Sequence, residues 1–174
     1  ISSFTNKTAS LFNTFSVFSP RFSQELPPLN YASKTAESMA NSYNAKLMDK
    51  SNASKKAFSE HLNKDQIIAL LSHGKSSSNE DESQKGIYLS DGFLSLNEIY
   101  NLHSSCGFLL LGTCESGVGY KENHEGNISL ARAFTAIGVK SMVLSSWKID
   151  ELSSTQIITS FFDYLSQGLT KSEA

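Results

Sequence analysis

Apolar residues along the chain fall into short runs separated by stretches with a helical period. The runs at 66–72 (QIIALLS) and 107–113 (GFLLLGT) are continuously apolar. This pattern is typical of strands that are buried on both faces of a parallel sheet. Weaker runs predict further strands, one of which includes a turn, at 13–20, 45–48, 86–92 and 140–147.

Between these runs, apolar residues recur every three or four positions, which predicts helices with one face toward the sheet. Ser95 and Glu98 have the spacing of a capping box and mark the start of a short helix at 96–102. Another helix is expected to be capped by Ser51 or Asn52. The predicted inward faces are Ala32, Ala36, Met39, Ala40 and Tyr43 in 31–43; Ala53, Ala57, Phe58 and Leu62 in the helix capped at 51 or 52; Ile128, Ala131, Phe134 and Ile137 in 128–138; and Ile157, Ile158, Phe161, Phe162 and Leu165 in 151–168.

The predicted elements follow the order β-α-β-α-β, then a hairpin with a short helix, then β-α-β-α. This alternation predicts an α/β fold, a three-layer α/β/α sandwich in which helices cover both faces of a mostly parallel sheet. The polar stretch at 75–85 predicts a loop. We find no internal repeat and no linker, so we expect a single domain over residues 1–174.

The composition and charge of the chain argue against binding to nucleic acid or to a membrane. A hydrophobic content of 39% is ordinary for a globular protein, and the net charge of -2 lacks the basic excess of a nucleic-acid-binding domain. No apolar run approaches the roughly 18–20 residues of a membrane span. The first ten residues contain no basic or apolar region typical of a signal peptide. We therefore expect a cytoplasmic domain that binds neither nucleic acid nor membrane.

The chain has two cysteines, Cys106 and Cys114, too few for a disulfide framework. If 107–113 is a strand, eight residues at about 3.3 Å each place the two Cα atoms about 26 Å apart. A disulfide needs a Cα separation below about 7 Å. The strand therefore excludes a bond between them, and a reducing compartment is expected.

Two predicted strands end in chemically reactive residues, His73-Gly74 and Thr113-Cys114. Catalytic groups gather at the carboxyl ends of parallel strands. If these strands are neighbours, His73 can deprotonate the Cys114 thiol, and the backbone N–H groups of Gly74 and Cys114 can receive an oxyanion. A cysteine after an apolar run is also commonly a small buried side chain, and a His-Gly pair a turn. The residues alone leave both interpretations open.

Other chemistries find little support in the sequence. His61, His103 and His124 have no cysteine or histidine partner at zinc-site spacing. No GxxxxGK or GxGxxG motif follows a predicted strand. We expect neither a metal nor a cofactor.

Four segments, taken in order, resemble the CHAT domain family: IIALLSHG, IYLSDGFLSLNEIYNL, FLLLGTCESGVG and HEGNISLARAFTAIGVKSMVLSSWKID. CHAT domains are caspase-like cysteine peptidase domains, related to separases and gingipains and often attached to TPR repeats. The resemblance covers roughly residues 13–174. It implies a caspase-haemoglobinase fold with a catalytic dyad, whose histidine falls on His73 and whose cysteine falls on Cys114.

The resemblance also implies functional residues after the last strand. The family tryptophan falls on Trp147, and the family's Asp-Asp pair is replaced by Asp150-Glu151. We predict that these three residues line the substrate pocket, with a preference for basic side chains. Asp150 alternatively caps the helix that it precedes. A second departure is Thr113, where the family often has alanine.

The first functional hypothesis is a cysteine endopeptidase that acts through an acyl-enzyme on protein or peptide substrates. The alternatives are a catalytically silent interaction module and a Cys-His esterase or transferase. Family members carry further sequence on both sides, so we expect the chain to be truncated at both ends. We also expect latency, relieved by a TPR-type sensing domain or an activating partner.

Overall fold

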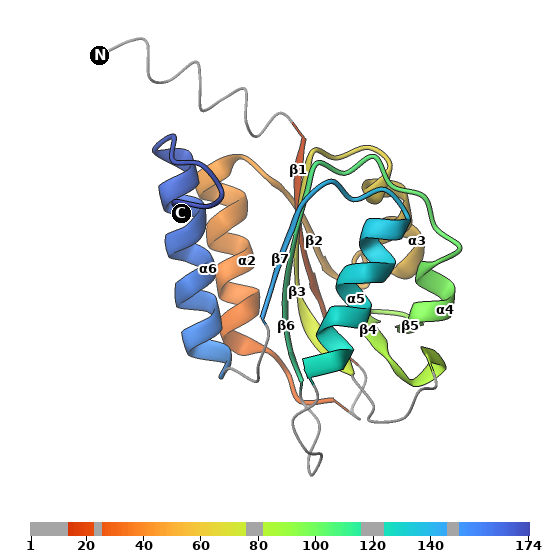
Figure 1. Ribbon diagram of the computed structural model, residues 1–174. Coiled ribbons are helices and arrows are strands. Elements are labelled where there is room, and N and C mark those ends of the chain that lie inside the picture. The colour runs from red at the N-terminus through yellow and green to blue at the C-terminus, as the bar shows by residue number, and fades with distance from the viewer. Residues whose placement is uncertain (1–13, 23–25, 76–81, 116–123, 146–149) are drawn as a thin grey trace.

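The computed structural model describes residues 14–22, 26–75, 82–115, 124–145 and 150–174, with the backbone alone for Glu82, Thr113–Glu115 and His124–Asn127 (Figure 1). The strands are β1 (Phe15–Pro20), β2 (Lys46–Lys50), β3 (Ile67–Lys75), β4 (Gly86–Leu89), β5 (Gly92–Ser95), β6 (Phe108–Glu115) and β7 (Met142–Leu144). The helices are α2 (Asn30–Tyr43), α3 (Lys55–Leu62), α4 (Leu96–Ile99), α5 (His124–Ala136) and α6 (Glu151–Ser166), with a 3₁₀ turn at Glu82–Gln84. This order confirms the predicted alternation.

Five strands form a parallel sheet in the order β2-β1-β3-β6-β7. The β4–β5 hairpin joins β3 in antiparallel orientation through Gly74 and Lys75. The pairing of β1 with β3 stops at Leu70, so β4 takes the place beside β3 that β1 has left. The mostly parallel sheet of the sequence prediction is therefore present, and the hairpin lies next to its carboxyl edge.

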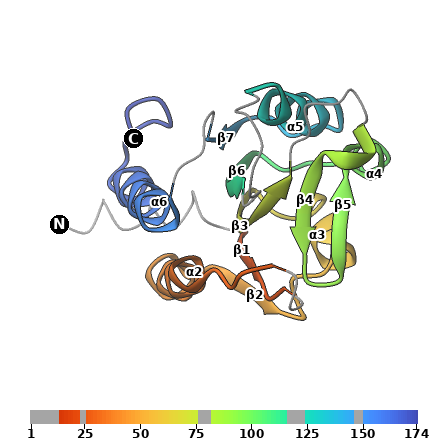
Figure 2. The same ribbon diagram turned by 90° about the horizontal axis from the view of Figure 1, so that it is seen from below.

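Helices cover both faces of the sheet, as predicted (Figures 1 and 2). Helices α2 and α6 lie on one face, and α3, α4 and α5 lie on the other. The residues of β3 alternate between the two cores: Ile68 and Leu70 pack toward α3 and α5, and Ala69 and Leu71 pack toward α2 and α6. Strands buried on both faces need apolar residues at every position, which explains the continuous apolar runs.

The helix faces differ in part from the prediction. Ile128 and Ile157 were expected to point inward, but they are 47% and 60% exposed. Helix α5 buries Leu130 and Ala133 instead, beside the correctly predicted Phe134. The apolar positions of α5 and α6 spread over more than one face, so their period alone does not single out the buried stripe.

Two helix starts show what the local sequence determines. The capping box of Ser95 and Glu98 is present at α4. The cap of α3 is Ser54, which accepts from the Ala57 N–H, so the expected cap at Ser51 or Asn52 was wrong. No described helix is long and apolar enough to cross a membrane.

Candidate active site

The two candidate reactive residues lie opposite each other in the sheet. His73 on β3 and Cys114 on β6 are Cα partners in parallel register. Neighbouring strands are about 4.8 Å apart. Both residues lie at the carboxyl ends of their strands, since β3 ends at Lys75 and β6 at Glu115. The expected adjacency of the two strand ends is therefore confirmed at the level of the backbone.

The His73 imidazole is buried, with 1% of the residue exposed. Its Nε2 lies 2.8 Å from the Pro27 carbonyl oxygen, and the Phe22 ring packs against it with a centroid distance of 4.6 Å. A carbonyl oxygen can only accept a hydrogen bond, so Nε2 carries the proton. In a neutral ring, Nδ1 then holds the lone pair. Among the described residues, buried Nδ1 has no hydrogen-bond partner.

The surroundings of His73 favour its neutral form. Burial lowers the pKa of His73 below its usual value, because a charged imidazolium would lose its hydration. The hydrogen bond to the Pro27 carbonyl and the negative charge of Glu151 act in the opposite direction and limit the effect. The neutral, proton-accepting form therefore predominates at pH 7.

The loop before α2 holds this histidine, which the sequence analysis did not anticipate. Proline has a fixed φ, and a residue that precedes proline is restricted to extended conformations. Pro27 is followed by Pro28, so both effects apply to the peptide that presents the carbonyl. The Pro-Pro pair was the available signal, but nothing local connects it with a histidine 46 residues later.

The two predicted oxyanion donors, the backbone N–H groups of Gly74 and Cys114, lie within paired strands of the sheet. Gly74 pairs with Glu115 on β6 and with Ile87 on β4. Cys114 pairs with His73, so the two N–H groups come from adjoining positions of one parallel ladder. Their part in an oxyanion hole stays a prediction.

The predicted substrate-binding residues lie near the start of α6. Trp147 falls outside the described residues. Asp150 is exposed and accepts a hydrogen bond from the Ser153 N–H at 2.9 Å, so it is the N-cap of α6, as one of the two alternatives held. Glu151 accepts from the Ala32 N–H of α2, also at 2.9 Å. A substrate-binding role for the three residues stays a prediction.

A recess of about 500 Å³ adjoins the site. Ser19 and Asp49, near the carboxyl ends of β1 and β2, contribute to its lining. Phe22 and Pro27 also line it, and these two residues contact His73. The His73 surroundings and the recess therefore share a wall.

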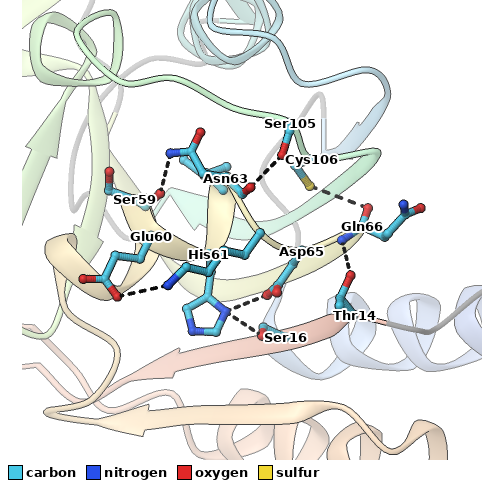
Figure 3. Close-up of polar contacts among 12 residues, drawn as sticks. Thr14, Ser16, Ser59, Glu60, His61, Asn63, Asp65, Gln66, Ser105 and Cys106 are labelled. Atoms are coloured by element: carbon cyan, nitrogen blue, oxygen red, sulfur yellow. Dashed lines mark hydrogen bonds and ion pairs between the residues drawn. The ribbon is translucent and has the colours of Figure 1, made fainter.

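Another buried histidine, His61, lies at the opposite, amino edge of the sheet in a polar cluster (Figure 3). His61 Nδ1 is 2.6 Å from the Asp65 carboxylate and 2.9 Å from the Ser16 hydroxyl. A catalytic relay needs the carboxylate and the nucleophile on different ring nitrogens. Here both contact Nδ1, so the geometry is that of a buried structural cluster.

Cys106 belongs to this amino edge as well (Figure 3). It is free and fully buried, and its Sγ contacts the Phe108 carbonyl at 3.2 Å. Burial raises the pKa of its thiol to about 11, so the thiolate is scarce at neutral pH. Among the described residues, no cluster of histidine, cysteine and carboxylate side chains could hold a metal ion.

The mostly parallel central sheet with helices on both faces is that of a caspase-like α/β/α sandwich. The CHAT domain family model matches residues 5–174, so the chain belongs to the CHAT domain family. This match confirms the resemblance stated from the four sequence segments. No curated protein matches the chain.

Proposed function

We propose that the chain is a cysteine endopeptidase domain in which His73 is the general base and Cys114 the nucleophile. One relationship carries the proposal: His73 lies in register with Cys114 and is held by Pro27 with its Nε2 proton engaged. The remaining nitrogen, Nδ1, is buried and has no partner among the described residues. A neutral imidazole with a free Nδ1 is suited to accept a thiol proton.

The position of Cys114 supports the same assignment. Side chains alternate between the two faces along a strand, and in-register residues of parallel strands share a face. His73 is on the face of α2 and α6, two positions after Leu71. We therefore expect the Cys114 thiol on this face, within reach of Nδ1.

The proposed reaction begins with proton transfer from the thiol to Nδ1. The thiolate attacks the carbonyl carbon of the scissile peptide bond, and the negative charge moves to the carbonyl oxygen. The N–H groups of Gly74 and Cys114 are the proposed donors to this oxyanion. Its collapse breaks the C–N bond, and His73 returns the proton to the leaving amine. Water then hydrolyses the thioester with His73 as base and restores the thiol.

We extend the proposal to the substrate. Trp147 supplies an apolar wall, and Asp150 and Glu151 supply negative charge that favours basic side chains. Asp150 can serve while it caps α6, because its carboxylate is exposed and the capping hydrogen bonds lower its pKa, which keeps it charged. We propose further that activity is latent in the cytoplasm until an upstream TPR-type domain or a partner activates it.

Labelling with a peptidyl chloromethyl ketone tests the function in the intact protein. The expected result is one adduct on Cys114, lost in Cys114→Ala and retained in Cys106→Ala. Hydrolysis of a matching fluorogenic peptide should show the same dependence. A folded protein that binds the peptide without an adduct or turnover, under every activating condition, supports the silent interaction module instead. Turnover of small esters but not of peptides supports the esterase.

A further inference from the structure

Helix α2 begins without a cap of its own. Its N-cap position is Leu29, which makes no side-chain hydrogen bond, and its first turn contains no acidic residue. The first N–H groups of a helix lack partners within the helix and lie at its positive end. Glu151, the first residue of α6, accepts from the Ala32 N–H at 2.9 Å. The carboxylate of one helix thus caps another.

This cap lies close along the chain to the carbonyl that holds His73. Pro27, whose carbonyl accepts the Nε2 proton, precedes Ala32 by five residues. The intervening segment begins with Pro28, which restricts the conformations available to it. Because the segment is short and restrained, fixing Ala32 also limits the movement of the Pro27 carbonyl.

Glu151 also lies close to the strand residues that precede His73 and Cys114. It lines a cavity of about 10 Å³ together with Ser72 and Gly112, which precede His73 and Cys114 by one and two residues. Gly112 permits this approach of α6 to the sheet. A Cβ atom there would lie 2.8 Å from the Ile158 Cδ1 of α6 and 2.7 Å from the Leu71 Cδ2. The carboxylate is near enough for its charge to act on His73.

We propose that Glu151 is a positioning residue of the His73–Cys114 site. Its carboxylate fixes the first turn of α2 and thereby the Pro27 carbonyl, and its charge favours the imidazolium that forms when His73 accepts the thiol proton. The inference rests on the proposed peptidase function. It also assigns Glu151 a task other than contact with the substrate.

The chain offers a matched control at the other end of the same helix pair. The Tyr43 hydroxyl donates to Asp163 Oδ1 at 2.5 Å, which also links α2 to α6. Asp163→Asn therefore perturbs a polar link between the two helices far along them from the Glu151 contact. An effect seen with Glu151→Gln but not with Asp163→Asn cannot come from loosening the pair in general.

The decisive experiment is NMR titration of the His73 ring nitrogens in the Cys114→Ala background, where catalysis plays no part. We expect Glu151→Gln to lower the pKa of His73 further, because the charge that favours the imidazolium is lost. Glu151→Asp should restore part of the loss, and Asp163→Asn should change nothing. An unchanged His73 pKa and unchanged ring shifts in a folded Glu151→Gln protein would overturn the proposal.

Kinetics of the intact protein separate this proposal from the peptidase proposal. Glu151→Gln should lower kcat by about 10- to 100-fold for neutral and basic substrates alike, whereas loss of the proposed substrate contact alone would raise KM for basic substrates only. A rise in KM for basic substrates, with an unaltered His73 titration, would mean that Glu151 contacts the substrate and would also overturn the positioning role. Absence of turnover in the wild-type protein under every activating condition would refute the peptidase function, while the titration would still show whether Glu151 acts on His73. If Glu151→Ala fails to fold, the results for Glu151→Gln and Glu151→Asp test the positioning role.

Discussion

His73 donates its Nε2 proton to the Pro27 carbonyl oxygen, and this bond sets the tautomer of the ring. Because Nε2 donates to this fixed acceptor, the lone pair of the neutral ring is on Nδ1. His73 lies on the face of the sheet that carries α2 and α6. A histidine alone at a strand end would have no preferred orientation. The hydrogen bond to the Pro27 carbonyl supplies one.

The two cysteines should differ sharply in reactivity. Cys106 is buried and its thiol has a pKa of about 11, so iodoacetamide at pH 7.5 should not modify it in the folded protein. Cys114 should be modified first, and Cys106 only after denaturant is added. Peptide mapping by mass spectrometry measures both sites in one sample. Equal modification of the two in the folded protein would contradict the assignment of Cys114 as the activated thiol.

Substitution of the same cysteines separates chemistry from packing. Cys114→Ala should abolish cleavage without loss of the fold. Cys106→Ala should leave kcat nearly unchanged but lower the free energy of unfolding by about 1–2 kcal/mol, because it removes a buried sulfur atom. Peptide hydrolysis and denaturant unfolding measure the two effects. Loss of turnover in both variants, with the fold of each intact, would show that Cys114 alone is not the nucleophile.

Much of the carboxyl edge could be predicted from sequence. The continuous apolar runs of β3 and β6 locate buried parallel strands, and the residues after them identify His73 and Cys114. The partner that orients His73 could not be predicted in this way. Pro27 lies in a loop between β1 and α2, and only the packing of α2 beside β3 brings it to the imidazole.

The start of α6 shows a similar limit. The sequence correctly offered Asp150 as a helix cap, because capping depends on residues within one turn. Glu151 bonds to a residue 119 positions earlier, a contact that no local pattern indicates. Local rules therefore account for the elements, whereas the contacts that join them at the site depend on tertiary packing.

The lowered pKa of His73 predicts a pH dependence of stability. Between the folded-state pKa and the ordinary value of about 6.5, the unfolded chain binds more protons than the folded chain. The free energy of unfolding should therefore fall as the pH decreases below about 6.5, and this contribution should be absent above about pH 7.5. Urea unfolding of the wild type, of His73→Gln and of the exposed control His103→Gln measures it. The slope should flatten in His73→Gln alone, and equal slopes in all three proteins would contradict the prediction.

Asp150→Asn separates the two roles that the sequence left open for this residue. Asparagine caps helices about as well as aspartate, so the stability of α6 should be preserved. The charge is removed, so any preference for arginine over neutral side chains at the cleavage site should weaken. Peptide-library profiling beside thermal unfolding measures both. An unchanged preference for arginine would mean that Asp150 acts only as the helix cap. An equal loss of activity toward all substrates would indicate a structural effect.

The close approach of α6 to β6 can be tested at Gly112. Gly112→Ala introduces a Cβ against the ends of Leu71 and Ile158 and should lower the free energy of unfolding by about 1–3 kcal/mol, the range for overpacking a core. Ile158→Val removes the Cδ1 atom that meets the new methyl group, at a cost of about 0.5–1.5 kcal/mol in an otherwise unchanged core. The double variant should therefore be less destabilised than the sum of the single variants, by about 0.5 kcal/mol or more. Denaturant unfolding of the four proteins closes the cycle, and strict additivity would show that the methyl group and Ile158 do not meet.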